Sequence, residues 1–359
     1  MEKETRMIPR IQKEAIIEKL CSNKLLFIQG PRKVGKSTLI KEVLHGLKAS
    51  FVWYDCSDKT IIKQLSFDNG IPKELLDESH EIVVLFDAQY LTNLDSILHE
   101  VLDGKIKSTL IIVCSYRPKI ETDLLKAIQI EGLEVNLFAP SFYESAKHFG
   151  LTNEEALLEE RLIYGNYPEV LADISNAEES LKGIIEHAIF TNLRDGERIN
   201  KGEKLVRMLQ LLAFNVGSTI TYNDISERCG LDNETVERYI KLLEDAFILL
   251  RLPSFHNNHR YELKKSNAIY FSDNGLRNVL ISNFNPTHLR NDMDQLWRNY
   301  VISERIKWIR MNQLDKKCFF WKTHTKQTID FVELGENKIQ AYKTDWEKRK
   351  KIKLPARFT

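Results

Sequence analysis

Residues 30–37 read GPRKVGKS and fit the pattern G-x-x-x-x-G-K-[ST], which is typical of a phosphate-binding loop. A short apolar run, residues 25–28, comes before the pattern, and residues 38–44 follow it with helical spacing. Strand, glycine-rich loop and helix is the order in which backbone N–H groups and a helix N-terminus can surround an anion. All fixed positions are filled and both flanks fit, so the stretch predicts an α/β fold of the P-loop NTPase type rather than a chance turn.

The loop motif also assigns a role to individual residues. Gly30 and Gly35 can take backbone conformations that are closed to other residues. We expect Lys36 to reach the β- and γ-phosphates of ATP and Ser37 to offer its hydroxyl to Mg²⁺. The predicted nucleotide-binding residues are Gly30, Pro31, Arg32, Lys33, Val34, Gly35, Lys36, Ser37 and Thr38.

Three further apolar runs predict a parallel sheet that is covered on both faces. They span residues 51–55, 82–87 and 109–115, with helical patterns between them. Ligands of such sheets bind at the carboxyl ends of the strands, where Asp87 and Ser115 fall together with Gly30. Asp87 is therefore expected on the Mg²⁺ side of the nucleotide, and Ser115 at the γ-phosphate or the attacking water. The alternatives are a solvated strand-end aspartate and a serine that only caps a turn.

The strand that ends in Asp87 carries one acid where hydrolysing ATPases of this kind usually carry two. It reads Leu85-Phe86-Asp87-Ala88-Gln89. Either Ala88 replaces the catalytic glutamate, or Phe86 replaces the metal acid and Asp87 stands at the glutamate position. General-base positioning contributes on the order of 10²–10⁴-fold to a rate. The sequence thus predicts nucleotide binding and leaves turnover open.

Bulk composition gives few further constraints. The chain has 359 residues, a formal net charge of +1 and five scattered cysteines without a C-x-x-C pair. Such a charge does not indicate nucleic acid, and such cysteines favour reduced thiols over a zinc site. No apolar stretch approaches the length of a membrane span, and the charged N-terminus is unlike a secretory signal. We expect a cytoplasmic protein that does not enter a membrane.

An ordered series of short motifs continues through the rest of the chain. The motifs are IPR at 8–10, Gln89 after the strand acid, PSFYE at 140–144, YGNYPE at 164–169, YIKLLEDAF at 239–247 and YFSDNGL at 270–276. With the P-loop, the series resembles uncharacterised prokaryotic AAA-type P-loop ATPases that carry a C-terminal winged helix and a restriction-endonuclease-like domain. The resemblance covers nearly the whole chain and implies an architecture more than a cellular process.

The resemblance implies four parts and a set of candidate arginines for the γ-phosphate. The parts are a nucleotide domain (1–140), a helical lid (141–202), a winged helix-turn-helix (203–285) and a degenerate nuclease-like domain (286–359). The candidate arginines are Arg117, Arg161, Arg194 and Arg198. The resemblance favours Arg194, which would act in cis or from a neighbouring subunit. AAA-type modules often form rings, so the sequence leaves the oligomeric state open.

The residues expected to form the winged helix differ in how well their charge suits DNA binding. Thr221 is expected to cap a helix over 222–229 that Gly230 ends, and a second helix is expected from residue 233 to about 246. That second helix is nearly balanced in charge, whereas DNA readers neutralise phosphates. The expected wing loop, 256–265, is more basic, and His256 and His259 in it lack further metal ligands. DNA and a protein both stay open as partners.

The final region keeps part of a nuclease pattern. Glu304 matches the helix acid, Asp330 the first metal acid and Lys343 the lysine of E-x-K, but Ala341 stands where the acid of E-x-K belongs. The loss of one carboxylate weakens a site for a hard cation, so we do not expect metal-dependent cleavage. The basic residues from 348 to 353 are expected to contact phosphates or to be a solvated end.

Three functional hypotheses follow. The favoured one is an ATP-binding protein whose nucleotide state moves its C-terminal domains, with hydrolysis weakened or lost. The second is a slow but genuine ATPase that acts on DNA or a protein, with Glu42, Asp55 or Glu81 as a further acid. The third is a DNA-binding module in which the nucleotide is structural.

Overall fold

The structure is a computed structural model, and the chain divides into two compact units. The first unit is residues 7–139, and the second runs from Pro140 to the C-terminal region. The structure describes residues 7–66, 72–130, 134–190, 202–255, 267–323, 327–336 and 338–347. Each unit is described by itself.

A five-stranded parallel sheet forms the centre of the first unit. Its strands are β1 (Leu25–Gln29), β2 (Phe51–Asp55), β3 (Ile82–Phe86), β4 (Thr109–Cys114) and β5 (Glu134–Asn136). The order across the sheet is β2-β3-β4-β1-β5, and every pairing is parallel. The four apolar runs thus form strands as predicted. β5 was not predicted, because its three residues contain one apolar side chain between two polar ones and form no apolar run.

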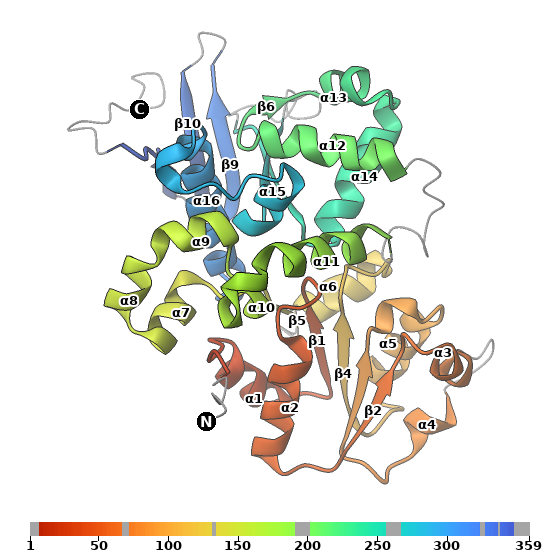
Figure 1. Ribbon diagram of the computed structural model, residues 1–359. Helices are drawn as coiled ribbons and strands as arrows, with labels where there is room; N and C mark the ends of the chain where they lie inside the picture. The colour runs from red at the N-terminus through yellow and green to blue at the C-terminus, as the bar shows by residue number, and fades with distance from the viewer. Residues whose placement is uncertain are drawn as a thin grey trace. The chain divides into compact units, whose positions relative to one another are not determined.

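Helices cover both faces of this sheet (Figure 1). They are α1 (Lys13–Ser22), α2 (Lys36–Leu47), α3 (Lys59–Leu65), α4 (Lys73–Leu76), η1 (Ala88–Tyr90), α5 (Leu94–Leu102) and α6 (Thr122–Ile130). Leu25 and Phe27 point to one face and belong to a core with Leu98 of α5. Leu26 and Ile28 alternate with them and are equally buried on the face of α1 and α2. The sheet is therefore fixed from both sides, and its carboxyl edge is held in place.

The second unit begins with a helical region. Its elements are α7 (Phe142–Phe149), α8 (Leu151–Ala156), α9 (Leu158–Tyr164), α10 (Pro168–Ala172), η2 (Ile174–Asn176) and α11 (Ala177–Phe190). Ser141 and Glu144 form a reciprocal capping box at the start of α7. The expected helical character of the region after residue 141 is confirmed as far as the structure describes it.

Three helices and three short strands follow. They are α12 (Gly202–Phe214), β6 (Thr219–Ile220), α13 (Tyr222–Cys229), α14 (Asn233–Asp245), β7 (Leu249–Pro253) and β8 (Asn267–Phe271). Thr221 caps α13 through the N–H of Asp224, and Gly230 ends the helix in the left-handed conformation, both as predicted. The antiparallel sheet has the order β6-β8-β7, and β7 pairs with β8.

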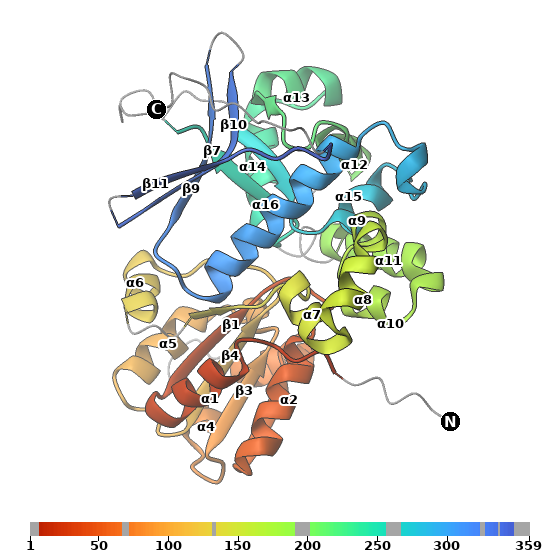
Figure 2. The ribbon, with the colours of Figure 1, turned by 90° about the vertical axis from the view of Figure 1, so that its left-hand side faces the viewer.

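A long helix and a second antiparallel sheet complete the unit (Figure 2). The elements are α15 (Asn274–Leu280), η4 (Thr287–Leu289), α16 (Met293–Met311), β9 (Lys317–Lys322), β10 (Thr328–Gly335) and β11 (Lys338–Tyr342). The strand order is β11-β10-β9. Ser254 forms a parallel bridge with Phe320, which joins the end of β7 to β9. The two small sheets are thus linked along the backbone.

Buried polar contacts fasten the helical region of the second unit to α15. Asn278 of α15 donates to the carbonyl oxygen of Ile163 at 2.7 Å, and the N–H of Asn166 donates to the Asp273 carboxylate at 2.8 Å. All four residues are buried. Polar pairs in a low-dielectric interior are costly to separate. The segment around α9 is therefore joined to α15 by buried hydrogen bonds within the second unit.

Candidate functional site

Close backbone packing explains the glycines of the P-loop. A Cβ atom on Gly30 would lie 1.9 Å from the carbonyl oxygen of Leu137, which no side chain allows. Gly35 has φ 95°, a left-handed conformation that favours glycine, and it caps α2. The loop therefore runs from the end of β1, past the chain that follows β5, into the start of α2.

Lys36 is buried, and carbonyl oxygens of the P-loop itself accept hydrogen bonds from its ammonium group. It is 4% exposed, and its Nζ donates to the carbonyl oxygens of Gly30 and Pro31 at 2.8 Å each. Burial lowers the pKa of Lys36 from 10.5 to about 7, while the nearby negative charge of Asp87 opposes the decrease. An anionic ligand would supply the counter-charge that this lysine lacks.

Asp87 lies at the carboxyl end of β3 and faces the P-loop. Its Oδ1 accepts from the Ser115 hydroxyl at 2.5 Å and from Nε2 of Gln89 at 3.0 Å. Its Oδ2 is 3.3 Å from NH2 of Arg32. Asp87 has φ 53°, an uncommon left-handed conformation for a residue with a side chain, and it is buried. The structure thus brings together the strand acid, the strand-end serine and the P-loop, as the sequence predicts for three strand ends.

Gln89 and Tyr90 complete the network and were not assigned these roles from the sequence. Oε1 of Gln89 accepts from the N–H of Ser115 at 3.0 Å, so its amide joins Asp87 to the end of β4. The Tyr90 hydroxyl accepts from NH2 of Arg32 at 2.9 Å. The only sequence signal was a glutamine two residues after the strand acid. The amide of Gln89 therefore contacts both the Asp87 carboxylate and the backbone at the end of β4.

Ala88 points away from this network. It is fully buried in the core that includes Leu85, Leu94 and Ile112. The left-handed backbone of Asp87 starts the 3-10 helix η1 and turns Ala88 inward. A glutamate side chain at position 88 would therefore enter the apolar core instead of the network around Asp87.

Arg10, which precedes the P-loop in the sequence, donates hydrogen bonds that hold the loop in place. Its NH1 donates to the carbonyl oxygen of Val34 at 2.8 Å, and its NH2 donates to that of Phe138 at 2.5 Å. Arg10 is buried. Sequence analysis identified Arg10 only as part of the IPR motif, because no sequence pattern marks an arginine that binds carbonyl oxygens. This residue ties the loop to the segment after β5.

The structure separates the three acids that were considered as a second catalytic group. Glu42 of α2 pairs with Lys13 at 2.5 Å, and Glu81 precedes β3 at the amino edge, where it accepts from the N–H of Ser50. Asp55 ends β2 and pairs in register with Phe86, directly before Asp87. Of the three, Asp55 lies at the edge of the sheet that carries the P-loop.

The candidate arginines also differ. Arg161 is buried and makes two hydrogen bonds to Glu154, at 2.6 and 3.1 Å, which commits its guanidinium to the second unit. Arg117 follows β4 and is half-buried. Arg194 and Arg198 lie outside the described residues, as do the wing loop with His256 and His259 and the basic residues from 348 onward.

Glu304, Asp330 and Lys343, the three nuclease-like positions, each contact backbone or side-chain groups of the fold. Glu304 accepts from the N–H of Phe142 at 2.8 Å and from Lys307 at 2.9 Å. Asp330 accepts from the N–H of Thr344 at 2.8 Å and lies 3.4 Å from Nε of Arg298. Nζ of Lys343 is 3.4 Å from the carbonyl oxygen of Thr328. Across the described ranges, no group of three or more His, Cys, Asp or Glu side chains could hold a metal ion.

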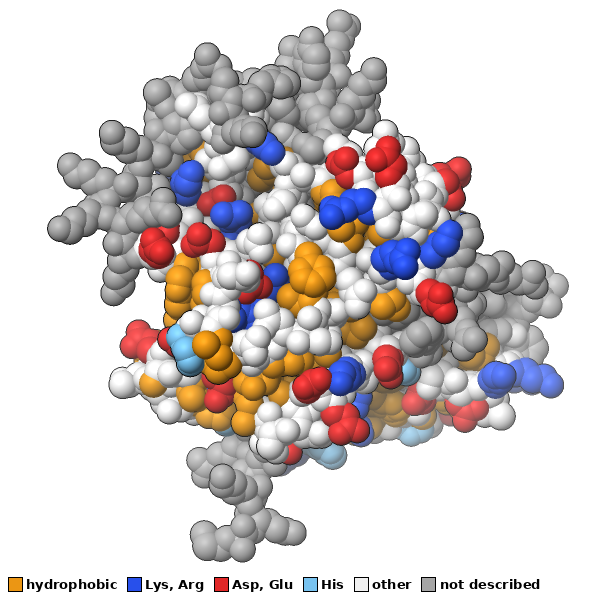
Figure 3. Space-filling model, turned by 45° about the horizontal axis from the view of Figure 1, so that its top comes forward, with side chains coloured by type: hydrophobic (Ala, Val, Ile, Leu, Met, Phe, Trp, Pro, Cys, Tyr) orange, Lys and Arg blue, Asp and Glu red, His pale blue; other side chains and the backbone are white. Residues whose placement is uncertain are grey.

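Helix α14 presents a mixed charge to solvent. Its exposed residues include Glu234, Glu237, Arg238 and Lys241, and Lys241 pairs with Asp245 at 2.9 Å. Acidic and basic side chains are interspersed on the face drawn in Figure 3. DNA binding relies on the neutralisation of phosphates, and the exposed acids of this helix balance its exposed bases.

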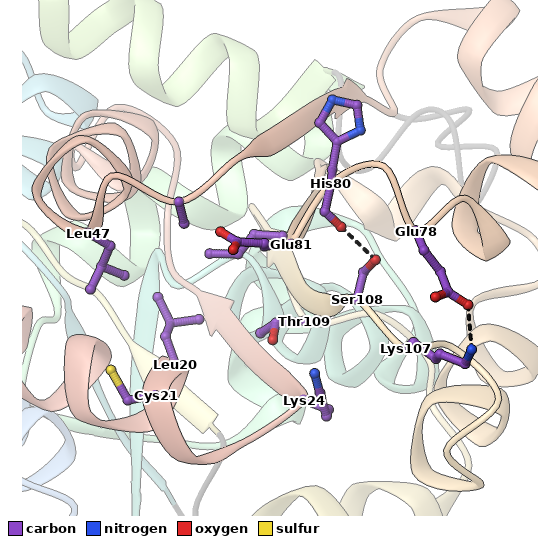
Figure 4. Close-up of a pocket in the computed structure, with 12 residues that line it drawn as sticks. Leu20, Cys21, Lys24, Leu47, Glu78, His80, Glu81, Lys107, Ser108 and Thr109 are labelled. Carbon is purple, nitrogen blue, oxygen red and sulfur yellow. Dashed lines mark hydrogen bonds and ion pairs between the residues drawn. The ribbon is translucent and has the colours of Figure 1, made fainter.

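A cavity of about 490 Å³ lies at the amino ends of the strands (Figure 4). Ile82 and Thr109, the first residues of β3 and β4, line it. Lys107 in its wall pairs with Glu78 at 2.6 Å. The cavity is therefore at the opposite edge of the sheet from Gly30. Glu81 lines it, whereas Lys36, Asp87 and Ser115 do not.

Comparison with known proteins supports an AAA-type P-loop ATPase domain. Residues 22–146 match the family model of the AAA domain, and residues 155–287 match a domain of unknown function (DUF8612). An uncharacterized protein of Haemophilus influenzae is 23% identical over 270 residues, which cover 70% of this chain and 67% of that protein.

Two solved structures show the level of structural similarity. The Walker-type ATPase PABY2304 of Pyrococcus abyssi has a TM-score of 0.51 and 16% identity, over 77% of this chain and 97% of that chain. This similarity concerns the fold. RuvB of Thermotoga maritima, a Holliday junction branch migration motor, has a TM-score of 0.34 and 12% identity, over 69% of this chain and 93% of that chain. No described helix is long and apolar enough to cross a membrane.

The residues at the P-loop fit a magnesium nucleotide. Close packing at Gly30 and the left-handed backbone of Gly35 favour glycine, Lys36 is buried and donates to two carbonyl oxygens of the loop, and Ser37 follows it in the first turn of α2. Asp87 supplies a carboxylate oxygen, which suits a hard divalent cation. When bound, Mg²⁺ would offset part of the negative charge of the phosphates.

Proposed function

We propose that this protein binds Mg²⁺-ATP through the P-loop and uses the nucleotide state to position its C-terminal regions, with ATP hydrolysis weakened or lost. Lys36 would contact the β- and γ-phosphates, and Ser37 and Asp87 would hold the metal. Ser115 would act at the γ-phosphate. The remaining loop residues, from Gly30 to Thr38, would surround the phosphates with N–H groups.

One observation carries this proposal. Asp87 is the single carboxylate in a network of Arg32, Gln89 and Ser115, and both of its oxygens already have partners. A general base must reach the proton of its nucleophile by a direct hydrogen bond or through one water. Asp87 is engaged, Gln89 carries no charge, and Ala88 is buried in the core. The site thus has charged groups and hydrogen-bond donors that can bind a nucleotide, but these three positions offer no free base that could activate water.

The proposed architecture of the second unit follows from its element order. Helices α12, α13 and α14 with the sheet β6-β8-β7 have the order of a winged helix, and we assign residues 203–285 to it. We assign residues 286–359 to a degenerate restriction-endonuclease-like domain and residues 141–202 to the helical region that the resemblance calls a lid. Arg194, outside the described residues, stays the proposed γ-phosphate arginine.

Glu304 suggests how movement could pass through the second unit. It belongs to α16 and receives the N–H of Phe142, the first residue of α7, two residues after the unit begins. A displacement of α7 would therefore carry α16 with it. We propose that the second unit moves as one body in response to nucleotide, rather than by closure of a separate lid.

A slow but genuine ATPase is the second candidate, and the position of Asp55 favours it. This acid ends β2 at the carboxyl edge, adjacent in the sheet to the strand of Asp87. Asp55 is exposed, and its Oδ1 accepts from the N–H and hydroxyl of Ser57. Single-turnover hydrolysis that depends on Asp55 would establish this alternative.

The charge of α14 favours a protein over DNA as the partner of the winged helix. Its two exposed acids oppose its two exposed bases. A DNA-binding module with a structural nucleotide would instead show an affinity for duplex that falls steeply with salt. Absence of duplex binding at low salt would eliminate that third reading.

Equilibrium titration of ATP in Mg²⁺ tests the binding proposal. The Lys36→Ala variant is expected to lose at least about 100-fold in affinity, because charge-assisted hydrogen bonds contribute ~1.5–3 kcal/mol each and 1.4 kcal/mol is tenfold. Lys24→Ala, an exposed lysine before β1, serves as the control and should bind like the wild type. Equal affinity of the Lys36→Ala variant would refute ATP binding through the P-loop.

A further inference from the structure

Arg32 is a second cation of the P-loop pocket, and its contacts set it apart from an ordinary surface arginine. Its NH2 lies 3.3 Å from Oδ2 of Asp87 and donates to the Tyr90 hydroxyl at 2.9 Å. Its Nε is buried and has no hydrogen-bond partner among the described residues. The P-loop motif allows any residue at this position, so the motif does not explain an arginine here.

The two oxygens of Asp87 are not equivalent. Oδ1 accepts from Ser115 and from Gln89. Within the described ranges, Oδ2 has the ion pair with Arg32 as its partner. A divalent cation beside the phosphates takes carboxylate oxygens directly or through water, so Oδ2 is the oxygen that it would meet. Two cations at one oxygen repel each other, and the repulsion is strong where water is excluded.

We propose that Arg32 is an internal counter-cation of Asp87, which competes with the divalent cation for Oδ2 and thereby sets the metal requirement of nucleotide binding. The inference rests on the proposed nucleotide-binding function and adds a regulatory element to the same site. Without metal, Arg32 neutralises Asp87 and keeps the pocket positive toward a polyphosphate. With metal, the hydroxyl of Tyr90 keeps the guanidinium of Arg32 beside the pocket.

This role predicts opposite effects of Arg32 on two affinities. In the Arg32→Gln variant, metal-free ATP meets an unneutralised carboxylate, so binding in EDTA weakens. The affinity of the ATP complex for Mg²⁺ rises, because its competitor at Oδ2 is gone. The ratio of the ATP dissociation constants in EDTA and in saturating Mg²⁺ is therefore expected to increase by about tenfold, the effect of one charge contact.

Calorimetric titration of the full chain with ATP, in EDTA and in saturating Mg²⁺, measures this ratio. The set is wild type, Arg32→Gln, Tyr90→Phe and, as a charge-matched control, Lys24→Gln at the amino end of β1. Tyr90→Phe removes the second anchor of Arg32 without a change in charge, so the ratio should rise by roughly two- to fivefold. Lys24→Gln should leave the ratio at the wild-type value.

The outcomes separate this inference from the proposed function. If wild type binds ATP but neither Arg32→Gln nor Tyr90→Phe changes the ratio, the counter-cation role is overturned while ATP binding stands. If the Arg32→Gln protein does not fold, the Tyr90→Phe ratio decides alone, and an unchanged value overturns the inference. If wild type binds no ATP in either condition, the proposed function fails and the inference fails with it.

Discussion

The sequence predicts one acid where two are expected both in the P-loop region and in the region of Glu304, Asp330 and Lys343, and the structure arranges the residues of these two regions differently. Around Asp87, the hydroxyl of Ser115, the amide of Gln89 and the guanidinium of Arg32 converge on one carboxylate beside the buried Lys36. In the other region, the predicted site residues each contact a different part of the fold, and Glu304 binds the backbone of α7.

This difference separates a group of polar side chains that contact one another from a group whose members each contact other parts of the fold. Asp87 and its counter-cation Arg32 are charged groups that can interact with a charged ligand such as a magnesium nucleotide. Asp330 is occupied by the N–H of Thr344 and lies close to Arg298, and Lys343 contacts a carbonyl oxygen. We infer that the first region binds a nucleotide and that the second holds the unit together.

The largest expected effect is loss of the fold of the P-loop through Gly30→Ala. The added Cβ would lie 1.9 Å from the backbone oxygen of Leu137, which cannot move aside as a flexible side chain could. We expect destabilisation above ~3 kcal/mol and loss of ATP binding. Chemical denaturation measures the former.

The matched control for this substitution is Gly46→Ala. Gly46 is also in the first unit, within α2, and its Cβ would meet no atom within 4 Å. Alanine in a helix interior stabilises by ~0.5–1 kcal/mol relative to glycine. Equal stability of the two variants would contradict the close packing of the loop.

A comparison of Ala88→Glu and Gln89→Glu tests whether position 88 lies in the apolar core and position 89 beside Asp87. Glutamate at 88 would be placed among Leu85, Leu94 and Ile112, and an unpaired buried charge destabilises by several kcal/mol. Glutamate at 89 has the size of the native residue and adds a carboxylate beside Asp87. We expect Gln89→Glu to lose less stability than Ala88→Glu, although it replaces the amide donor to Asp87 with a like charge, and to hydrolyse ATP faster, by ~10-fold or more.

Thermal unfolding and single-turnover hydrolysis measure the two effects. Faster hydrolysis by Ala88→Glu, together with normal stability, would show that position 88 faces the nucleotide. That result would contradict the inward orientation of Ala88.

The pH dependence of ATP binding follows from the pKa of Lys36, which burial lowers to about 7. Above pH 7 the lysine of the empty site is neutral, and phosphates favour its charged form, so binding takes up a proton. Affinity should therefore fall as pH rises from 7 to 9, by up to about tenfold per pH unit. In saturating Mg²⁺ the terminal phosphate stays ionised across this range.

The control for this prediction is Lys36→Arg, because an arginine does not titrate in this range. Its ATP affinity should be flat between pH 7 and 9, and calorimetry in two buffers should detect no proton uptake from position 36. A flat profile in the wild type would mean that Lys36 is charged in the empty site.

The smallest effects are expected in the nuclease-like region. Glu304→Ala removes the acceptor for the N–H of Phe142 and should destabilise the protein by ~1–3 kcal/mol. Glu304→Gln keeps an acceptor and should cost less, and Glu237→Ala, an exposed acid of α14, should be neutral. Denaturant titration measures the series. Mg²⁺-dependent DNA cleavage that Glu304→Gln abolishes would contradict the structural role.

The sequence predicts most of the first unit because its strands are unbroken apolar runs and its loop is a strict motif. It predicts that Asp87 and Ser115 meet, because parallel strands end at one edge. It does not predict β5, which pairs through its backbone, or Arg10, which binds carbonyl oxygens. The inward turn of Ala88 depends on the left-handed backbone of Asp87, which the residue type does not reveal.

Single-turnover hydrolysis tests the central claim most directly. Radiolabelled Mg²⁺-ATP is incubated with an excess of wild-type protein, with Lys36→Ala as the control, and the protein-bound nucleotide is identified. We predict that ATP stays intact on the wild type and is not retained by the variant. Release of phosphate by the wild type that requires Lys36 and is complete within minutes would show a competent ATPase and contradict a site that binds without turnover.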